Sequence, residues 1–127
     1  MDGFILALDQ GTTSCRALLF NRQGEIVSTA QREFQQYFPK SGWVEHDAEE
    51  ILTVQMDMAS EALSNAGVSP DEIRAIGITN QRETVVVWDK ESGEPIYKAI
   101  VWQDKRTAAY CEELKEAGKQ DLIREKT

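Results

Sequence analysis

The residues best suited to chemistry lie together at positions 9–14, where the sequence reads Asp-Gln-Gly-Thr-Thr-Ser. A turn around Gly11 can direct successive backbone N–H groups into a concavity that favours an anion such as a phosphate group. Asp9 ends an apolar run and is a candidate ligand for Mg²⁺, a hard cation that prefers oxygen ligands. The side chains predicted to bind phosphate oxygens are three hydroxyls and a nearby cation: Thr12, Thr13, Ser14 and Arg16. The alternative is an ordinary hairpin turn, and a Walker loop is excluded because no Gly-Lys-Ser/Thr follows.

A second polar segment, residues 80–84, follows an isoleucine-rich strand pattern and reads Asn-Gln-Arg-Glu-Thr. Polar side chains at this end of a strand are typical of the sites of open α/β sheets. Arg82 can donate to hydroxyl oxygens and Glu83 can accept from hydroxyl protons, so the two residues form a candidate polyol site. Trp102 can add an apolar face against the carbon atoms of the same ligand. The alternatives are a surface ion pair, worth about 0–1 kcal/mol, and a tryptophan of the core.

The single histidine of the chain, His46, lies between two acidic residues, Glu45 and Asp47. We predict a structural role for it rather than a catalytic one. The acidic residues at positions 45–50 suit the N-terminus of a helix, where negative charge is favoured, and this explains them better than a metal site does.

The elements that position these residues begin with three predicted strands at 4–8, 16–20 and 25–34. Tight turns join them, and the second turn ends at Gly24, so the pattern predicts an antiparallel meander. Residues 35–46 have no clean period and are predicted to form a loop.

A long amphipathic helix is predicted to begin after Asp47, an N-cap residue with Glu50 three positions on as in a capping box. Gly67 is the expected left-handed cap at its end. The predicted apolar face comprises Ile51, Val54, Met58, Ala62 and Leu63, and the outward positions include Gln55, Asp57, Glu61 and Asn65. Residues 74–79 then read as a central strand, which gives the order β-β-β-α-β.

Residues 84–88 and 99–102 are predicted to pair as strands around a turn at 90–95. Residues 106–117 have a helical face formed by Tyr110, Cys111 and Leu114. Residues 119–127 begin another charged helical pattern that stops without a cap, so we expect the chain to be a piece of a longer protein.

The composition narrows the function classes. The chain has 127 residues, a net charge of −8 and a pI near 4.7, so it lacks the basic footprint of a nucleic-acid-binding protein. Its 41% hydrophobic content is sufficient for a core. Two distant cysteines without metal or redox spacing, and the absence of a readable signal peptide or membrane span, predict a cytoplasmic protein.

Four segments of the chain resemble the N-terminal part of the sugar-kinase family, a branch of the ribonuclease H-like, actin-like superfamily. They are Ala-Leu-Asp-Gln-Gly-Thr-Thr-Ser at 7–14, Gly-Trp-Val-Glu-His-Asp at 42–47, Gly-Ile-Thr-Asn-Gln-Arg-Glu-Thr at 77–84 and Val-Trp-Gln-Asp at 101–104. The first is shared broadly among sugar kinases, whereas the second and third together point to the glycerol kinases. The resemblance spans nearly the whole chain.

The resemblance implies the roles of the site residues: Asp9 in the magnesium site; Thr12, Thr13, Ser14 and Arg16 at the nucleotide phosphates; Arg82 and Glu83 at the glycerol hydroxyls; and Trp102 on the glycerol carbons. It implies ATP and Mg²⁺ as cofactors and transfer of the γ-phosphoryl group to glycerol to give sn-glycerol 3-phosphate. Catalysis of this kind rests mostly on positioning and charge stabilisation.

The resemblance also implies the architecture. We expect an α/β, ribonuclease H-like fold with a mixed sheet and flanking helices, in which residues 1–127 form the N-terminal part of the first domain and the fold is incomplete at its C-terminus. The rest of that domain, a second domain and the general base are expected beyond Thr127. The fragment alone is then predicted to be inactive, and the complete enzyme to be a homo-oligomer.

Other functions share parts of this pattern. A kinase for pentuloses or other polyols would use the same phosphate turn. A nucleotide-binding switch of the actin or heat-shock ATPase type would have no polyol pocket, and Arg82 with Glu83 speaks against it. A ribonuclease H-like nuclease would need several carboxylates around two metals, but the strand after the helix ends in Asn-Gln-Arg at 80–82. A non-catalytic interaction module is the remaining alternative for the fragment.

Overall fold

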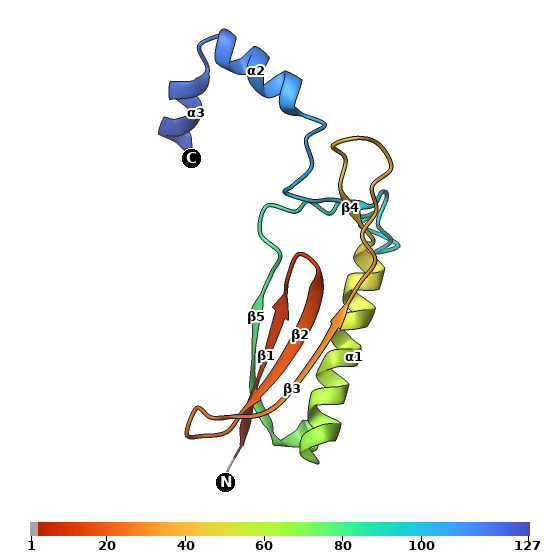
Figure 1. Ribbon diagram of the computed structural model, residues 1–127. Coiled ribbons are helices and arrows are strands. Elements are labelled where there is room, and N and C mark those ends of the chain that lie inside the picture. The colour runs from red at the N-terminus through yellow and green to blue at the C-terminus, as the bar shows by residue number, and fades with distance from the viewer. Residues whose placement is uncertain (1–2) are drawn as a thin grey trace.

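The computed structural model describes residues 3–127 as a four-stranded mixed sheet with one long helix packed on it (Figure 1). The strands of this sheet are β1 (Phe4–Gln10), β2 (Ser14–Phe20), β3 (Ile26–Glu33) and β5 (Ile73–Thr79). The first three form an antiparallel meander, β5 runs parallel to β1, and the spatial order is β3-β2-β1-β5. The helix α1 (Ala48–Ala66) connects the meander to β5, with the short 3₁₀ helix η1 (Pro70–Glu72) between them. The predicted β-β-β-α-β order is confirmed.

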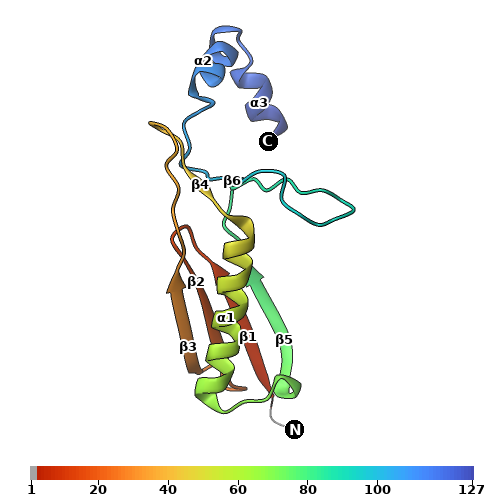
Figure 2. The same cartoon turned by 90° about the vertical axis from the view of Figure 1, so that its right-hand side faces the viewer.

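The core lies between α1 and one face of the meander. Alternate residues of β2 point toward the helix and are buried, namely Cys15, Ala17 and Leu19. The helix contributes Val54, Met58, Ala59 and Ala62 to the same cluster. The side chains at the opposite positions of the strands face away from α1, and Figure 2 shows the helix running along a single side of the sheet.

Gln55 was predicted to face outward, and this is wrong, because its side chain is fully buried against the sheet. Its Nε2 donates to the backbone carbonyl of Arg16 at 3.0 Å, which joins α1 directly to β2. A polar residue is tolerated in this layer because that hydrogen bond offsets part of its desolvation.

Both ends of α1 carry the predicted caps. The Asp47 carboxylate accepts from the backbone N–H groups of Glu49 and Glu50, and Gly67 takes the left-handed conformation with a φ of 65°. The reciprocal half of the capping box is absent, because the Glu50 carboxylate instead accepts from the backbone N–H of Gln35 at 2.8 Å. Glu50 therefore fixes the loop before the helix rather than the cap itself.

The strand β5 was predicted to be central, but within residues 3–127 it is an edge strand that pairs with β1 alone. Its side chains Ile76 and Ile78 are register partners of Leu6 and Leu8 in the core cluster, so they lie on the same side of the sheet as α1. They are exposed because the helix packs mainly on β2 and β3. An isoleucine-rich sequence is typical of a buried parallel strand, but the outer edge of β5 has no neighbouring strand within residues 3–127.

A smaller unit follows β5. The predicted strand pair of 84–88 with 99–102 is reduced to one bridge, between Val85 and Ile100. Instead β6 (Ala99–Ile100) pairs with β4 (Glu45–His46), inside the predicted loop. The helices α2 (Ala108–Glu116) and α3 (Gln120–Lys126) come last and extend away from the sheet (Figure 1).

The predicted apolar face of the helix at 106–117 does not form a core contact. The helix begins only at Ala108, none of its residues is buried, and Tyr110 is exposed. The periodicity was correct for a helix, but within residues 3–127 Cys111 and Leu114 border a small apolar hollow shared with Ile123 of α3 rather than the core. No helix in the described part of the chain is both long and apolar enough to cross a membrane.

Candidate active site

A cleft of about 470 Å³ opens at the carboxyl ends of β1 and β5. Because these two strands are parallel neighbours, the segments that follow them emerge at the same edge of the sheet. Residues 9–12 line one wall and residues 79–83 line the other. Trp102, which follows β6, also lines the cleft. The residues predicted from the sequence that line it are Asp9, Thr12, Arg82, Glu83 and Trp102.

The turn between β1 and β2 is closed by a hydrogen bond from the N–H of Gly11 to the carbonyl of Ser14, at 2.9 Å. A Cβ atom at Gly11 would lie 3.0 Å from that carbonyl oxygen, so the tight turn favours glycine. Thr12 faces the cleft and accepts a hydrogen bond from the indole N–H of Trp102, at 3.0 Å. Thr13 is exposed beside it.

Ser14 and Arg16 do not line the cleft; they lie on the sheet face opposite α1. The Arg16 Nε donates to the Gln31 carboxamide oxygen at 3.1 Å, and the Gln31 Nε2 donates to the Ser14 hydroxyl at 3.0 Å. Gln31, on β3, was missed in the sequence. Its position in the predicted meander could have revealed it, because cross-strand pairing places Gln31 opposite Arg16.

Asp9 is the cross-strand partner of Arg16 on β2 and the register partner of Thr79 on β5. No group of three or more acidic, histidine or cysteine side chains gathers anywhere in residues 3–127 in a way that could enclose a metal ion. A single carboxylate at the mouth of a cleft fits Mg²⁺, which often keeps several waters and takes the rest of its ligands from substrate phosphates. It does not fit a cation that requires a protein cage.

Arg82 and Glu83 stand at the opposite wall, and neither forms an ion pair within the described residues. Their polar groups are therefore available to a ligand. Glu83 has a φ of 59° and is the only non-glycine residue among 3–127 with a positive φ. This backbone conformation costs an L-residue roughly 1–2 kcal/mol, and such strain concentrates at functional sites.

Trp102 is 52% exposed, so it is not a core residue. Its indole ring lies at the mouth of the cleft, held by the hydrogen bond to Thr12. The residue before it, Val101, is buried and donates its N–H to the carbonyl of Val44 at 3.1 Å. The ring is therefore mounted on a backbone segment that is anchored to the β4 region.

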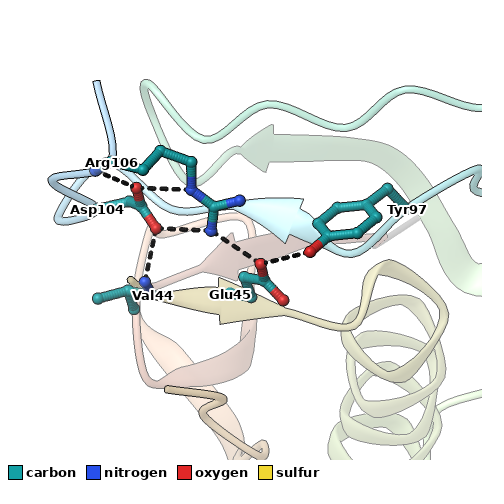
Figure 3. A network of polar contacts seen from close by, with 5 residues as sticks. All are labelled: Val44, Glu45, Tyr97, Asp104 and Arg106. Carbon is teal, nitrogen blue, oxygen red and sulfur yellow. Dashed lines mark hydrogen bonds and ion pairs between the residues drawn. The ribbon is translucent and has the colours of Figure 1, made fainter. Parts of the chain in front are cut away.

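A buried ionic network fixes that segment (Figure 3). Arg106 donates to both carboxylate oxygens of Asp104 and to Oε1 of Glu45, each at 2.8 Å. Asp104 also accepts from the backbone N–H of Val44 at 2.7 Å, and Glu45 accepts from the Tyr97 hydroxyl at 2.9 Å. The Arg106 hydrogen bonds hold the pKa of Asp104 down at about 2, so its carboxylate stays charged at neutral pH.

The acidic residues at positions 45–50 were predicted to suit the helix dipole. That is wrong for Glu45, which lies in β4, is buried and pairs with Arg106. The structural role predicted for His46 agrees with its complete burial. Arg106 was missed in the sequence, and Asp104 was noted only as part of the segment 101–104, because their other partners in this network, Val44 and Glu45, lie about sixty positions away.

Residues 4–127 match the N-terminal domain of the FGGY family of carbohydrate kinases. The glycerol kinase of Paraburkholderia phytofirmans is 62% identical over 126 residues, which is 99% of this chain and 25% of that protein. The glycerol kinase of Bacillus cytotoxicus is 61% identical over 127 residues, or 26% of its length. The chain thus spans about a quarter of the length of these relatives.

A solved structure of similar fold is that of Plasmodium falciparum glycerol kinase with ADP, which has a TM-score of 0.82 and 36% identity, and the match covers 89% of this chain and 23% of that one. The match over nearly the entire sequence, together with the turn after β1 and the cleft it lines, leads to one conclusion. The chain belongs to the FGGY family of carbohydrate kinases.

Proposed function

We propose that this chain is the N-terminal part of the first domain of an ATP-dependent kinase that phosphorylates glycerol to sn-glycerol 3-phosphate. The observation that carries the proposal is the cleft, where a glycine-containing hydroxyl turn and an Arg-Glu pair face one another below an exposed indole. The names of the relatives at about 60% identity support glycerol as the acceptor, and the solved relative with ADP supports an adenine nucleotide.

In this proposal Arg82 donates to the glycerol hydroxyl oxygens while the Glu83 carboxylate accepts hydroxyl protons, which sets the hydroxyl that faces the phosphate. The exposed face of Trp102 packs on the glycerol carbons, and its hydrogen bond to Thr12 ties the acceptor side of the cleft to the phosphate side. A cleft that closes over these groups excludes water, which would otherwise compete as the acceptor.

The phosphate side of the cleft is assigned to the turn after β1. Thr12 in the cleft and Thr13 beside it are the proposed donors to the nucleotide phosphates, and Ser14 and Arg16 would contact phosphate oxygens that extend past the rim onto the adjacent sheet face. Asp9 would hold the magnesium ion, which when bound neutralises charge on the phosphate oxygens.

The general base is proposed to lie outside this chain. Among the described residues two carboxylates line the cleft, those of Asp9 and Glu83, and each already has another role in the proposal. The chain alone is therefore expected to have no kinase activity, and measurable glycerol-dependent turnover by the purified 127-residue chain would contradict this assignment.

The test uses the complete kinase that carries this segment, with ADP release from ATP and Mg²⁺ measured separately with glycerol and with pentuloses. Glycerol-selective release is expected. Glu83→Ala should raise the KM for glycerol and leave that for ATP unchanged, whereas Glu91→Ala, in an exposed turn, is the matched control and should change neither. ADP release with a pentulose but not with glycerol would indicate a pentulose kinase. ADP release without any acceptor would favour a switch-type ATPase.

We further propose a cytoplasmic, homo-oligomeric enzyme that does not bind nucleic acid. The net charge of −8 supports the last point. The two cysteines are free; Cys15 is buried, and burial raises its pKa to about 11, as expected of an unreactive core thiol. Size-exclusion chromatography of the complete enzyme tests the oligomeric state.

A further inference from the structure

The imidazole of His46 does not line the cleft but contacts Gln81, which does, and it has no role in the proposed mechanism. The side chain is fully buried, and its ring packs edge-on against Phe34 with 5.0 Å between the centroids. Its Nε2 contacts the carboxamide oxygen of Gln36, and its Nδ1 lies 3.3 Å from that of Gln81. Each ring nitrogen thus meets the amide of a different segment.

The two carboxamides lead to opposite walls. The Nε2 of Gln36 donates to the carbonyl of Thr12 at 3.3 Å, in the turn assigned to phosphate, and to that of Phe34 at 3.4 Å. Gln81 lines the other wall, directly before Arg82. A continuous chain of polar contacts therefore runs from the phosphate turn, through one ring, to the proposed glycerol wall.

The hydrogen bonds determine which ring nitrogen carries the proton. Burial lowers the pKa of His46 and outweighs its contact with Gln81 and the charge of Glu50, which both raise it, so the ring is neutral at physiological pH. The NH₂ group of Gln36 donates to two carbonyls, so it is the Gln36 oxygen that faces the ring. Nε2 of the ring is therefore the donor in that contact. Nδ1 is then an acceptor.

The carboxamide of Gln81 is compatible with the same tautomer. Its Nε2 is buried and has no hydrogen-bond partner within the described residues while its oxygen faces Nδ1. A half-turn of the carboxamide, which exchanges nearly isosteric groups, pairs that NH₂ with the acceptor nitrogen Nδ1 and moves the Gln81 oxygen to the position that the NH₂ leaves. One tautomer of His46 thereby accounts for the contacts on both sides.

We propose that His46, as the Nε2–H tautomer, is a positioning residue that sets the two walls of the cleft relative to each other, holding the phosphate turn through Gln36 and the glycerol wall through Gln81. This inference rests on the proposed function for its kinetic consequences only. The ring touches neither nucleotide nor acceptor in this arrangement, and it acts through the two carboxamides.

Two substitutions separate the two contacts, because the amide of Gln reaches the position of Nε2 and that of Asn reaches the position of Nδ1. In the complete kinase, His46→Asn should lose the Gln36 side and raise the KM for ATP about three- to tenfold, with the KM for glycerol nearly unchanged. His46→Gln should show the opposite pattern, with the increase confined to glycerol. Equal increases in both variants, or none, would overturn the proposal.

A second measurement does not depend on activity. His46 is the only histidine of the 127-residue chain, so its ¹⁵N-labelled imidazole gives a single pair of NMR signals. A protonated Nε2 and an unprotonated Nδ1 are expected, and the reverse tautomer would refute the inference.

Hydrogen exchange provides the matching test of position. The N–H of Gly11 closes the phosphate turn and should exchange faster in His46→Asn than in His46→Gln. Equal exchange in the two variants would contradict the link through Gln36. If the wild-type kinase does not phosphorylate glycerol, the proposed function is wrong. The tautomer and the exchange rates still test the positioning role of His46 in that case.

Discussion

Removal of the Arg106 guanidinium should destabilise the protein far more than removal of an exposed cation. The side chains of Asp104 and Glu45 are 3% and 5% exposed, and that of Arg106 is 14% exposed. Arg106→Met would leave two nearly buried carboxylates without their counter-charge and delete three hydrogen bonds of 2.8 Å. Breaking a buried pair on one side costs about 3–5 kcal/mol, and the partial exposure of Arg106 places the expected loss near the lower end.

The matched control is Lys115→Met on α2, which removes an exposed pair with Glu112 at 2.7 Å and should leave the free energy of unfolding nearly unchanged. Urea unfolding followed by circular dichroism gives the loss from the shift of the midpoint at constant slope. Arg106→Lys keeps the charge without the planar fork, so an intermediate loss is expected, and this variant serves if Arg106→Met does not fold. Equal small losses for Arg106→Met and Lys115→Met would refute the role of the network.

Three further predictions concern single residues. The pKa of Asp104 is about 2 in the folded chain and near 3.8 when unperturbed, so its carboxylate stabilises the fold above about pH 4. This contribution should disappear as the pH falls toward 2. The free energy of unfolding of Asp104→Asn, measured over the same acid range, should not show that loss. Gly67→Ala places a side chain at a φ of 65° and should cost about 1 kcal/mol in urea unfolding, whereas Gly77→Ala, at a residue with nothing within 4 Å and no positive φ, should cost less. Glu83→Gly relieves the left-handed strain and should raise the midpoint of unfolding, while the complete kinase loses affinity for glycerol; a lower midpoint would show that Glu83 is not strained.

The local order of the fold was readable from the sequence. Strand and turn patterns gave the meander, and the helix from Ala48 to Ala66 was recognisable from its period and from the caps at Asp47 and Gly67. These signals depend on neighbours within four residues, where backbone geometry and side-chain type determine the structure. The same holds for the turn at Gly11, whose closing hydrogen bond spans three residues.

The cleft was readable in part, for a similar reason. Two polar segments at the ends of two strands were recognised as site candidates, and the parallel pairing of β1 with β5 brings them to one edge. Their composition identified donors and acceptors, but their mutual distance depended on which strands became neighbours. Periodicity does not encode that choice.

Local sequence patterns account for the meander, the capped helix, the tight turn at Gly11 and the kinds of polar group at the cleft. Three features depend instead on the folded arrangement: the burial of Gln55, the pairing of Glu45 with Arg106, and the contacts of His46 with Gln36 and Gln81. Each of these features involves a polar side chain buried against a distant partner. Burial of such a group is tolerable only when the partner is present, and the folded chain alone brings the two together.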